Sequence, residues 1–122
     1  MDHALLVSFL DGKTTPEDFS SLINEEVDAC VEGIRSPAKV GYIIVTDGPQ
    51  TTVTREHMRR LLRCMLDRSV PWQSANYTGD CLMMSEDFQP EDEAVVEAIE
   101  FVADDSRPPT VVETQRALAA LG

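Results

Sequence analysis

Apolar residues return at steps of three and four along most of this chain, which is the spacing of one face of an α-helix. The pattern is clearest between Pro16 and Ile34, where Thr15 suits the N-cap position and Pro16 the first helical position. The inward face of this helix holds Phe19, Leu22, Ile23, Val27, Cys30, Val31 and Ile34. Because shorter segments repeat the spacing, we predict a mainly α fold, a compact bundle of about six short helices in a single domain spanning residues 1–122.

The remaining helices are predicted from the same spacing and from capping residues. A short amphipathic helix is expected over residues 3–11, and Thr54 is expected to cap a helix with apolar residues from Met58 to Leu66. After a break at Pro71, one helical face runs from Trp72 to Met83.

Two further helices are expected in the C-terminal third. Pro90 suits the start of a helix that carries Glu91, Asp92 and Glu93 in its first turn, after a loop around residues 86–88. Thr110 with Glu113 forms a capping box for a last helix over residues 111–121.

One segment is typical of β-structure. Residues 42–46 are β-branched or aromatic, Asp47 and Gly48 form a turn signal, and residues 51–53 suit a returning strand. We therefore expect at most a small β-ribbon near residues 41–53, although Pro49 suits a tight hairpin poorly. A helical alternative for this apolar run stays open.

Composition excludes several classes of protein. The chain has 22 Asp and Glu against 10 Lys and Arg, a net charge of −12, which weighs against a surface that binds nucleic acid. No run of about 18 apolar residues is present, so we expect no membrane span, and the start of the chain lacks the features of a signal peptide. The three cysteines form no C-x-x-C pair, which favours reduced, mostly buried thiols in a cytoplasmic protein.

The negative charge is concentrated in one part of the chain. Residues 69–106 contain ten acidic residues and no Lys or Arg, whereas residues 54–68 carry a net charge of +3. Such a segment either forms a solvated face partly neutralised by the arginines beside it or attracts a basic partner. The candidate partner-binding residues are Asp80, Glu86, Asp87, Glu91, Asp92, Glu93, Glu97, Glu100, Asp104 and Asp105. Among these, Asp80 lies in apolar company and is expected to be partly buried.

No catalytic, metal-binding or cofactor-binding motif stands out. His57 and Cys64 share a helix face, but no third group by spacing completes a nucleophilic site, so we interpret them as a surface His and a core Cys. His3 is expected to be solvated. The carboxylate stripe at positions 93, 97, 100 and 104 lacks the E-x-x-H of helical-bundle metal sites. We therefore expect no catalytic residues, no metal and no cofactor.

Two further features have a structural and a functional interpretation. Trp72 and Tyr77 could anchor a partner, although their helical spacing favours core packing. The arginines of residues 55–63 could line a DNA-binding helix, but the net charge of −12 favours ion pairs with the acidic segment instead.

Two segments resemble small bacterial immunity proteins of the colicin D and contact-dependent growth inhibition types. These are Ala4–Phe19, a short helix followed by Gly12, Lys13 and a capped helix with a Phe, and Tyr77–Phe88, which precedes a Glu- and Val-rich helix. The resemblance covers about half of the chain. It implies a cytoplasmic inhibitor of a cognate toxin, commonly a basic nuclease domain, and it transfers no contact residues because the motifs are not diagnostic.

We therefore expect a non-enzymatic immunity protein that neutralises a basic toxin domain through its acidic surface. The alternatives are a nucleic-acid mimic that inhibits a DNA- or RNA-binding protein, a small enzyme with an unrecognised site, and an adaptor subunit. The toxin, the mode of blocking and the oligomeric state are not determined by the sequence.

Overall fold

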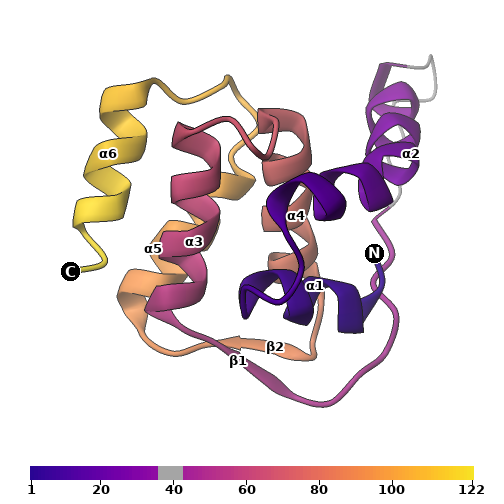
Figure 1. Cartoon of the computed structure of the whole chain (residues 1–122), viewed down its shortest axis with the longest axis horizontal. Helices are drawn as coiled ribbons and strands as arrows, with labels where there is room; N and C mark the ends of the chain where they lie inside the picture. Colours follow the sequence, from indigo (N-terminus) through magenta and orange to yellow (C-terminus); the bar gives the residue numbers. More distant parts are fainter. Residues whose placement is uncertain (36–42) are drawn as a thin grey trace.

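The chain was analysed as a computed structural model, which describes residues 1–35 and 43–122. Six helices and two short strands occur in these two ranges (Figure 1). In chain order they are α1 (His3–Leu10), α2 (Pro16–Arg35), β1 (Thr51–Val53), α3 (Arg55–Leu66), α4 (Trp72–Met84), β2 (Phe88–Pro90), α5 (Glu93–Ala103) and α6 (Val111–Ala119). The mainly α prediction, with its six helices and small sheet, is confirmed.

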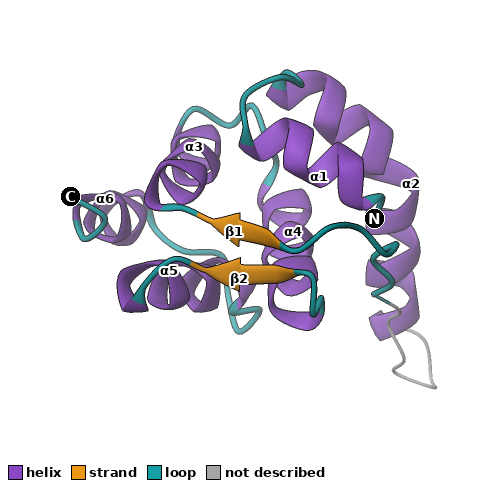
Figure 2. Ribbon diagram, turned by 90° about the horizontal axis from the view of Figure 1, so that it is seen from below, coloured by secondary structure: helices purple, strands orange, loops and turns teal. Residues whose placement is uncertain are grey.

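The helices are arranged around α3, α4 and α5. α4 packs most extensively against α5, while α6 packs on α3 and α2 on α4, so α2 and α6 lie at opposite ends of the molecule (Figure 1). The two strands lie at the lower edge of Figure 1 and side by side in Figure 2, and they lead to the first residues of α3 and α5. This arrangement exposes one side of α5 along its whole length.

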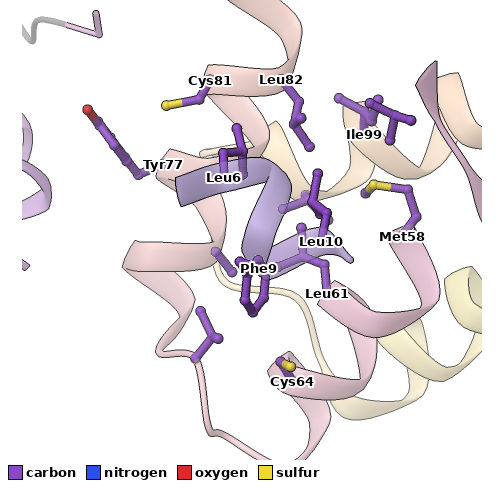
Figure 3. Packing of buried hydrophobic residues seen from close by; sticks show 14 of the residues in the cluster. Leu6, Phe9, Leu10, Met58, Leu61, Cys64, Tyr77, Cys81, Leu82 and Ile99 are labelled. Atoms are coloured by element: carbon purple, nitrogen blue, oxygen red, sulfur yellow. The ribbon is translucent and has the colours of Figure 1, made fainter. Parts of the chain in front are cut away.

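The core is built by most of the apolar residues that the helical spacing predicts, but Leu22 of α2, which was expected to face inward, is 66% exposed. Phe9 of α1 and Phe19 of α2 stack with ring centroids 4.1 Å apart, and both are fully buried. Leu10 of α1 and Leu61 and Met58 of α3 lie close to one another beside Phe9 (Figure 3). Each such side chain contributes about 1.5–3 kcal/mol through burial, which holds α1 and α2 to the rest of the bundle.

Local capping sets most helix boundaries. The hydroxyl of Thr54 accepts a hydrogen bond from the His57 amide, and the Thr54 amide donates to His57 Nδ1, which forms a reciprocal capping box at the start of α3. Thr110 and Glu113 form the predicted capping box of α6. These two predicted caps are confirmed.

The predicted start of α5 is wrong by three residues. Asp92 is the N-cap, because its carboxylate accepts a hydrogen bond from the Val95 amide, so α5 begins at Glu93. Pro90 is instead the last residue of β2, where it lies opposite Val53. The loop expected around residues 86–88 is correspondingly shorter, since the strand begins at Phe88.

The predicted ribbon within residues 41–53 is not formed in the part of it that the structure describes. β1 pairs in parallel with β2, with Thr51 opposite Phe88. Residues 43–46 are not a strand and instead lie along the N-terminus, where Ile44 accepts a hydrogen bond from the Met1 amino group at 2.7 Å and the Thr46 amide donates to Met1 at 3.0 Å. Residues 41 and 42 lie outside the described residues. Parallel strands are joined by a long crossover connection and not by a tight turn. Turn signals in the sequence therefore do not indicate which strand pairs with β1.

The environment of His3 also differs from expectation. Its side chain is buried rather than solvated, with 3% of the residue exposed, and its ring stacks on Phe88 at 4.7 Å. Gly48 packs directly on the same imidazole, where a larger residue would collide with it. The three cysteines are free and buried, as expected.

Candidate protein-binding surface

The carboxylates of α5 form an exposed stripe. Glu93, Glu97 and Glu100 are all exposed, because the opposite side of the helix is occupied by buried apolar residues, which are Val95, Ala98, Ile99 and Val102. None of the three forms a hydrogen bond through its side chain or an ion pair with any described residue. The stripe is therefore not neutralised by any described side chain.

The arginines of α3 neutralise little of this charge. Arg55 forms an ion pair with Asp92 at 2.8 Å, and its backbone amide donates to the Glu91 carboxylate. Arg59 donates to the carbonyl of Leu121 at the C-terminus, and Arg60 donates to the carbonyl of Leu10. The predicted pairing with the acidic segment is thus confirmed for Arg55 only, within the described residues.

Three further predicted residues have structural roles. Asp92 caps α5 and pairs with Arg55, which holds its pKa below the ordinary value. Asp87 accepts a hydrogen bond from the Gly48 amide at 3.2 Å and so fixes the loop before β1. Asp104 accepts from the Ser106 amide at 3.0 Å, which lowers its pKa. These contacts stabilise the fold and leave the three carboxylates less available to a partner.

An apolar groove lies beside the acidic stripe, between the end of α4, β2 and α5. It has a volume of about 350 Å³ and is lined by Met83, Met84, Phe88 and Val96, with Glu86 and Glu100 also in its lining. Met83 is 55% exposed and Met84 67% exposed. Exposed methionines are typical of adaptable binding surfaces because their side chains are flexible and polarisable.

The helical spacing predicts Met83 on one face with Trp72, and this prediction is wrong, since Met83 is exposed and lines the groove. A signal was available in Leu82, Met83 and Met84, because successive residues of a helix point about a quarter of a turn or more apart. Leu82 is buried in the core, so the two methionines that follow it cannot both be covered by the same packing. The exposure of at least one of these two methionines, at the end of α4, could therefore be predicted.

Asp80 and Asp105 lie apart from the groove. They line a second cavity, between α2 and α4. Asp80 is partly buried, as expected, and burial followed by the charge of Asp105 raises its pKa to about 6. Among the side chains of residues 1–33 and 43–122, none forms an ion pair with either carboxylate or donates a hydrogen bond to it.

The ten predicted residues thus separate into three groups. Glu86, Glu93, Glu97 and Glu100 form one acidic surface with the methionine groove, which we call the α5 surface. Glu91, Asp92, Asp87 and Asp104 make contacts within the fold. Asp80 and Asp105 belong to the cavity between α2 and α4.

The residues considered for catalysis are engaged in the fold. His57 accepts a hydrogen bond at Nδ1 from Thr54 and contacts Asp11 through Nε2 at 2.8 Å, so both ring nitrogens are occupied. Cys64 is buried, and burial raises the pKa of its thiol, which disfavours the nucleophilic thiolate.

Tyr77 is buried in the core, whereas Trp72 is partly exposed and lines two cavities.

The described residues contain neither a metal-binding cluster nor a membrane-spanning helix. No group of three or more His, Cys, Asp or Glu side chains within the described residues is placed to hold a metal ion. The carboxylate stripe of α5 is thus spread along the helix without converging. Over the same part of the chain, no helix combines the length and the apolar character that crossing a membrane requires.

Comparisons with known proteins give no relative. No protein-family model, no curated protein and no solved structure matches the chain.

Proposed function

We propose that this protein binds a basic protein through the α5 surface and thereby inhibits it, as an immunity protein neutralises the toxin domain that it recognises. The observation that carries the proposal is the placement of uncompensated carboxylates, Glu86 and Glu100, in the lining of an exposed methionine groove. Charge alone is common on solvated faces, and an apolar groove alone has many uses. The two together form a surface that suits a cationic and partly apolar partner.

Each component contributes a different part of binding. The stripe on α5 lies without counter-ions beside the groove, so it attracts a basic partner over a distance and speeds association, an effect that salt screens. The groove then removes apolar surface from water and slows dissociation. A nuclease domain is a suitable target, because its substrate cleft carries Lys and Arg side chains that the carboxylates occupy in place of phosphates. Inhibition of this kind takes place in the cytoplasm, where the chain's three free thiols stay reduced.

The proposal is tested with matched triple variants. The first, Glu93→Gln, Glu97→Gln and Glu100→Gln, removes three charges from α5. The second, Glu25→Gln, Asp28→Asn and Glu32→Gln, removes three equally exposed charges from α2 and serves as the control. Asp92 is left unchanged because it caps α5 and pairs with Arg55.

The partner is obtained by affinity purification at low salt, and its affinity is then measured by calorimetry with purified protein. We expect the α5 triple variant to weaken binding by about tenfold or more and to flatten the salt dependence, with a smaller effect of the α2 triple variant. A separate variant, Met83→Ala with Met84→Ala, is expected to raise the dissociation rate. Equal losses in the two triple variants would show that only net charge matters.

The nature of the target is tested with a panel of unrelated basic proteins. An immunity protein binds one toxin domain tightly and abolishes its activity. Similar affinity for several DNA- or RNA-binding proteins would instead support a nucleic-acid mimic. Binding that is indifferent to salt would contradict the proposed role of the carboxylates.

A further inference from the structure

The cavity between α2 and α4 has a composition unlike that of the groove. It has a volume of about 300 Å³, large enough for a small organic group. Val27 and Val31 of α2 contribute apolar side chains, Trp72 and Tyr77 of α4 contribute aromatic rings, and Asp80 and Asp105 contribute carboxylates. Two acids thus join an aromatic and aliphatic lining, and no Lys, Arg or His is among the described residues that line the cavity.

Neither carboxylate has a counter-charge among the side chains of residues 1–33 and 43–122. Asp80 is partly buried, and neither it nor Asp105 contacts a cation within the described part of the chain. Both line the same cavity, and the charge of Asp105 adds to burial in raising the pKa of Asp80. Two like charges beside an apolar cavity repel each other, and a cation placed between them would relieve this repulsion.

Other polar groups of the cavity are engaged elsewhere. The hydroxyl of Tyr77 points away from the core cluster (Figure 3) and donates to Glu26 at 3.2 Å. The amide of Asn76 donates to the Val102 carbonyl at 3.0 Å. The indole Nε1 of Trp72 is buried and finds no acceptor among the described residues. A ligand would thus meet carboxylate acceptors, aromatic surface and one free donor.

We propose that this cavity receives the end of an arginine or lysine side chain, with its alkyl stem against the valines and aromatic rings and its cationic group at Asp80 and Asp105. Guanidinium and ammonium groups suit this site because they bind carboxylates and are attracted to aromatic faces. A carbonyl near the cation could accept from Trp72. That the side chain belongs to a partner protein rests on the proposed function, whereas binding of the cation by the cavity does not.

The cavity is tested with small probes in the intact protein. Trp72 is the only tryptophan, so its fluorescence reports on the cavity without a label. We expect n-butylguanidinium to change this fluorescence saturably with a dissociation constant in the millimolar range, as befits a ligand of this size. The neutral analogue n-butylurea has nearly the same shape and is expected to leave the fluorescence unchanged.

Single charge-removing variants locate the binding. Asp80→Asn and Asp105→Asn are each expected to weaken binding of n-butylguanidinium by about tenfold, the loss of one charge-assisted hydrogen bond. Glu25→Gln removes the same charge from an exposed position of α2 outside the cavity and is the control. Asp105 follows α5 in an exposed loop, so its variant keeps the test valid if replacement of Asp80 disturbs α4.

The source of the cation is tested with a blocked arginine, N-acetyl-arginine-methylamide. Affinity equal to or above that of n-butylguanidinium supports a protein side chain, since the blocked backbone must then remain outside the cavity. If n-butylguanidinium binds and the blocked arginine does not, the assignment to a protein side chain is overturned in favour of a small free cation. No saturable change with either cation, or equal binding of n-butylurea, would overturn the cavity proposal itself. Because no residue of the α5 triple variant lines the cavity, failure of the partner assay leaves these outcomes distinct.

Discussion

Gly79 of α4 lies against the backbone of Ala103 at the end of α5. A Cβ atom at Gly79 would fall 2.9 Å from the Ala103 amide nitrogen and 2.9 Å from Cγ1 of Val102. The first of these neighbours is backbone, which cannot rotate away as a side chain can. The close approach of α4 and α5, which positions both the groove and the acidic stripe, therefore depends on the absence of a side chain at this position.

We expect Gly79→Ala to lower the free energy of unfolding by about 1–3 kcal/mol, because overpacking at the crossing exceeds the gain in helix propensity. Urea denaturation measures this change. Gln73→Ala, at an exposed position of the same helix, is the control and is expected to change stability by less than about 0.5 kcal/mol. Stabilisation by Gly79→Ala would show that the two helices separate at little cost.

Glu26 connects α2 to two other parts of the fold. Its carboxylate accepts from the Met1 amino group at 2.6 Å and from the Tyr77 hydroxyl at 3.2 Å. Tyr77→Phe is expected to lower the free energy of unfolding by about 1 kcal/mol, and Glu26→Gln by about 1–3 kcal/mol, because the amino group then loses a charged partner. Thermal denaturation of both variants, with Glu25→Gln as the exposed control, checks this order. A smaller effect for Glu26→Gln than for Tyr77→Phe would contradict it.

The raised pKa of Asp80 makes stability depend on pH. Its pKa is about 6 in the folded protein, above the ordinary value that it has in the unfolded chain, so the folded state binds more protons between these values. Stability contributed by protonated Asp80 is present at low pH and is lost as pH rises through 6. We expect Asp80→Asn to stabilise the protein at pH 7.5 by about 1 kcal/mol, after allowance for its partial exposure, and to have little effect near pH 4. Urea denaturation at both pH values tests this, and a pH-independent effect would contradict it.

Glu113 is expected to titrate at unusually low pH. Its carboxylate forms two hydrogen bonds with Arg107, at 2.8 and 2.7 Å, and also accepts from the Thr110 amide, which lowers its pKa to about 2. The ionised form is favoured by folding, so its contribution is present above the ordinary pKa and is lost as pH falls toward 2.

An NMR titration of the Glu113 side chain measures this pKa directly. In Arg107→Ala the pKa is expected to move upward, since the hydrogen bonds from the guanidinium that stabilise the ionised carboxylate are removed. In Thr110→Ala, loss of the N-cap is expected to lower the free energy of unfolding by about 1 kcal/mol. An unchanged pKa in Arg107→Ala would show that the capping interaction alone holds the carboxylate.

The candidate site could be predicted from the sequence only in part. The exposure of Glu93, Glu97 and Glu100 follows from helical spacing, which places them opposite the apolar face of α5. The role of Asp92 as N-cap of α5 was harder to predict, since Pro90 and Asp92 are both suitable residues for the start of this helix. Pro90 belongs instead to β2, which pairs with β1, and the helix therefore begins after Asp92. The cavity that joins Asp80 to Trp72 and Val27 depends on how α2 crosses α4, which no local pattern encodes.

The helices can be predicted from the sequence alone, because helical periodicity and capping are local. Thr54 and Thr110, for example, lie within three residues of the amides that they cap. Three features depend on the packing of the whole chain. Residues 51–53 pair in parallel with Phe88–Pro90, His3 is buried on Phe88, and Asp80 lines a cavity together with Asp105. These contacts join distant parts of the chain. Their partners are selected by packing of the whole core, in which many local patterns are satisfied at once.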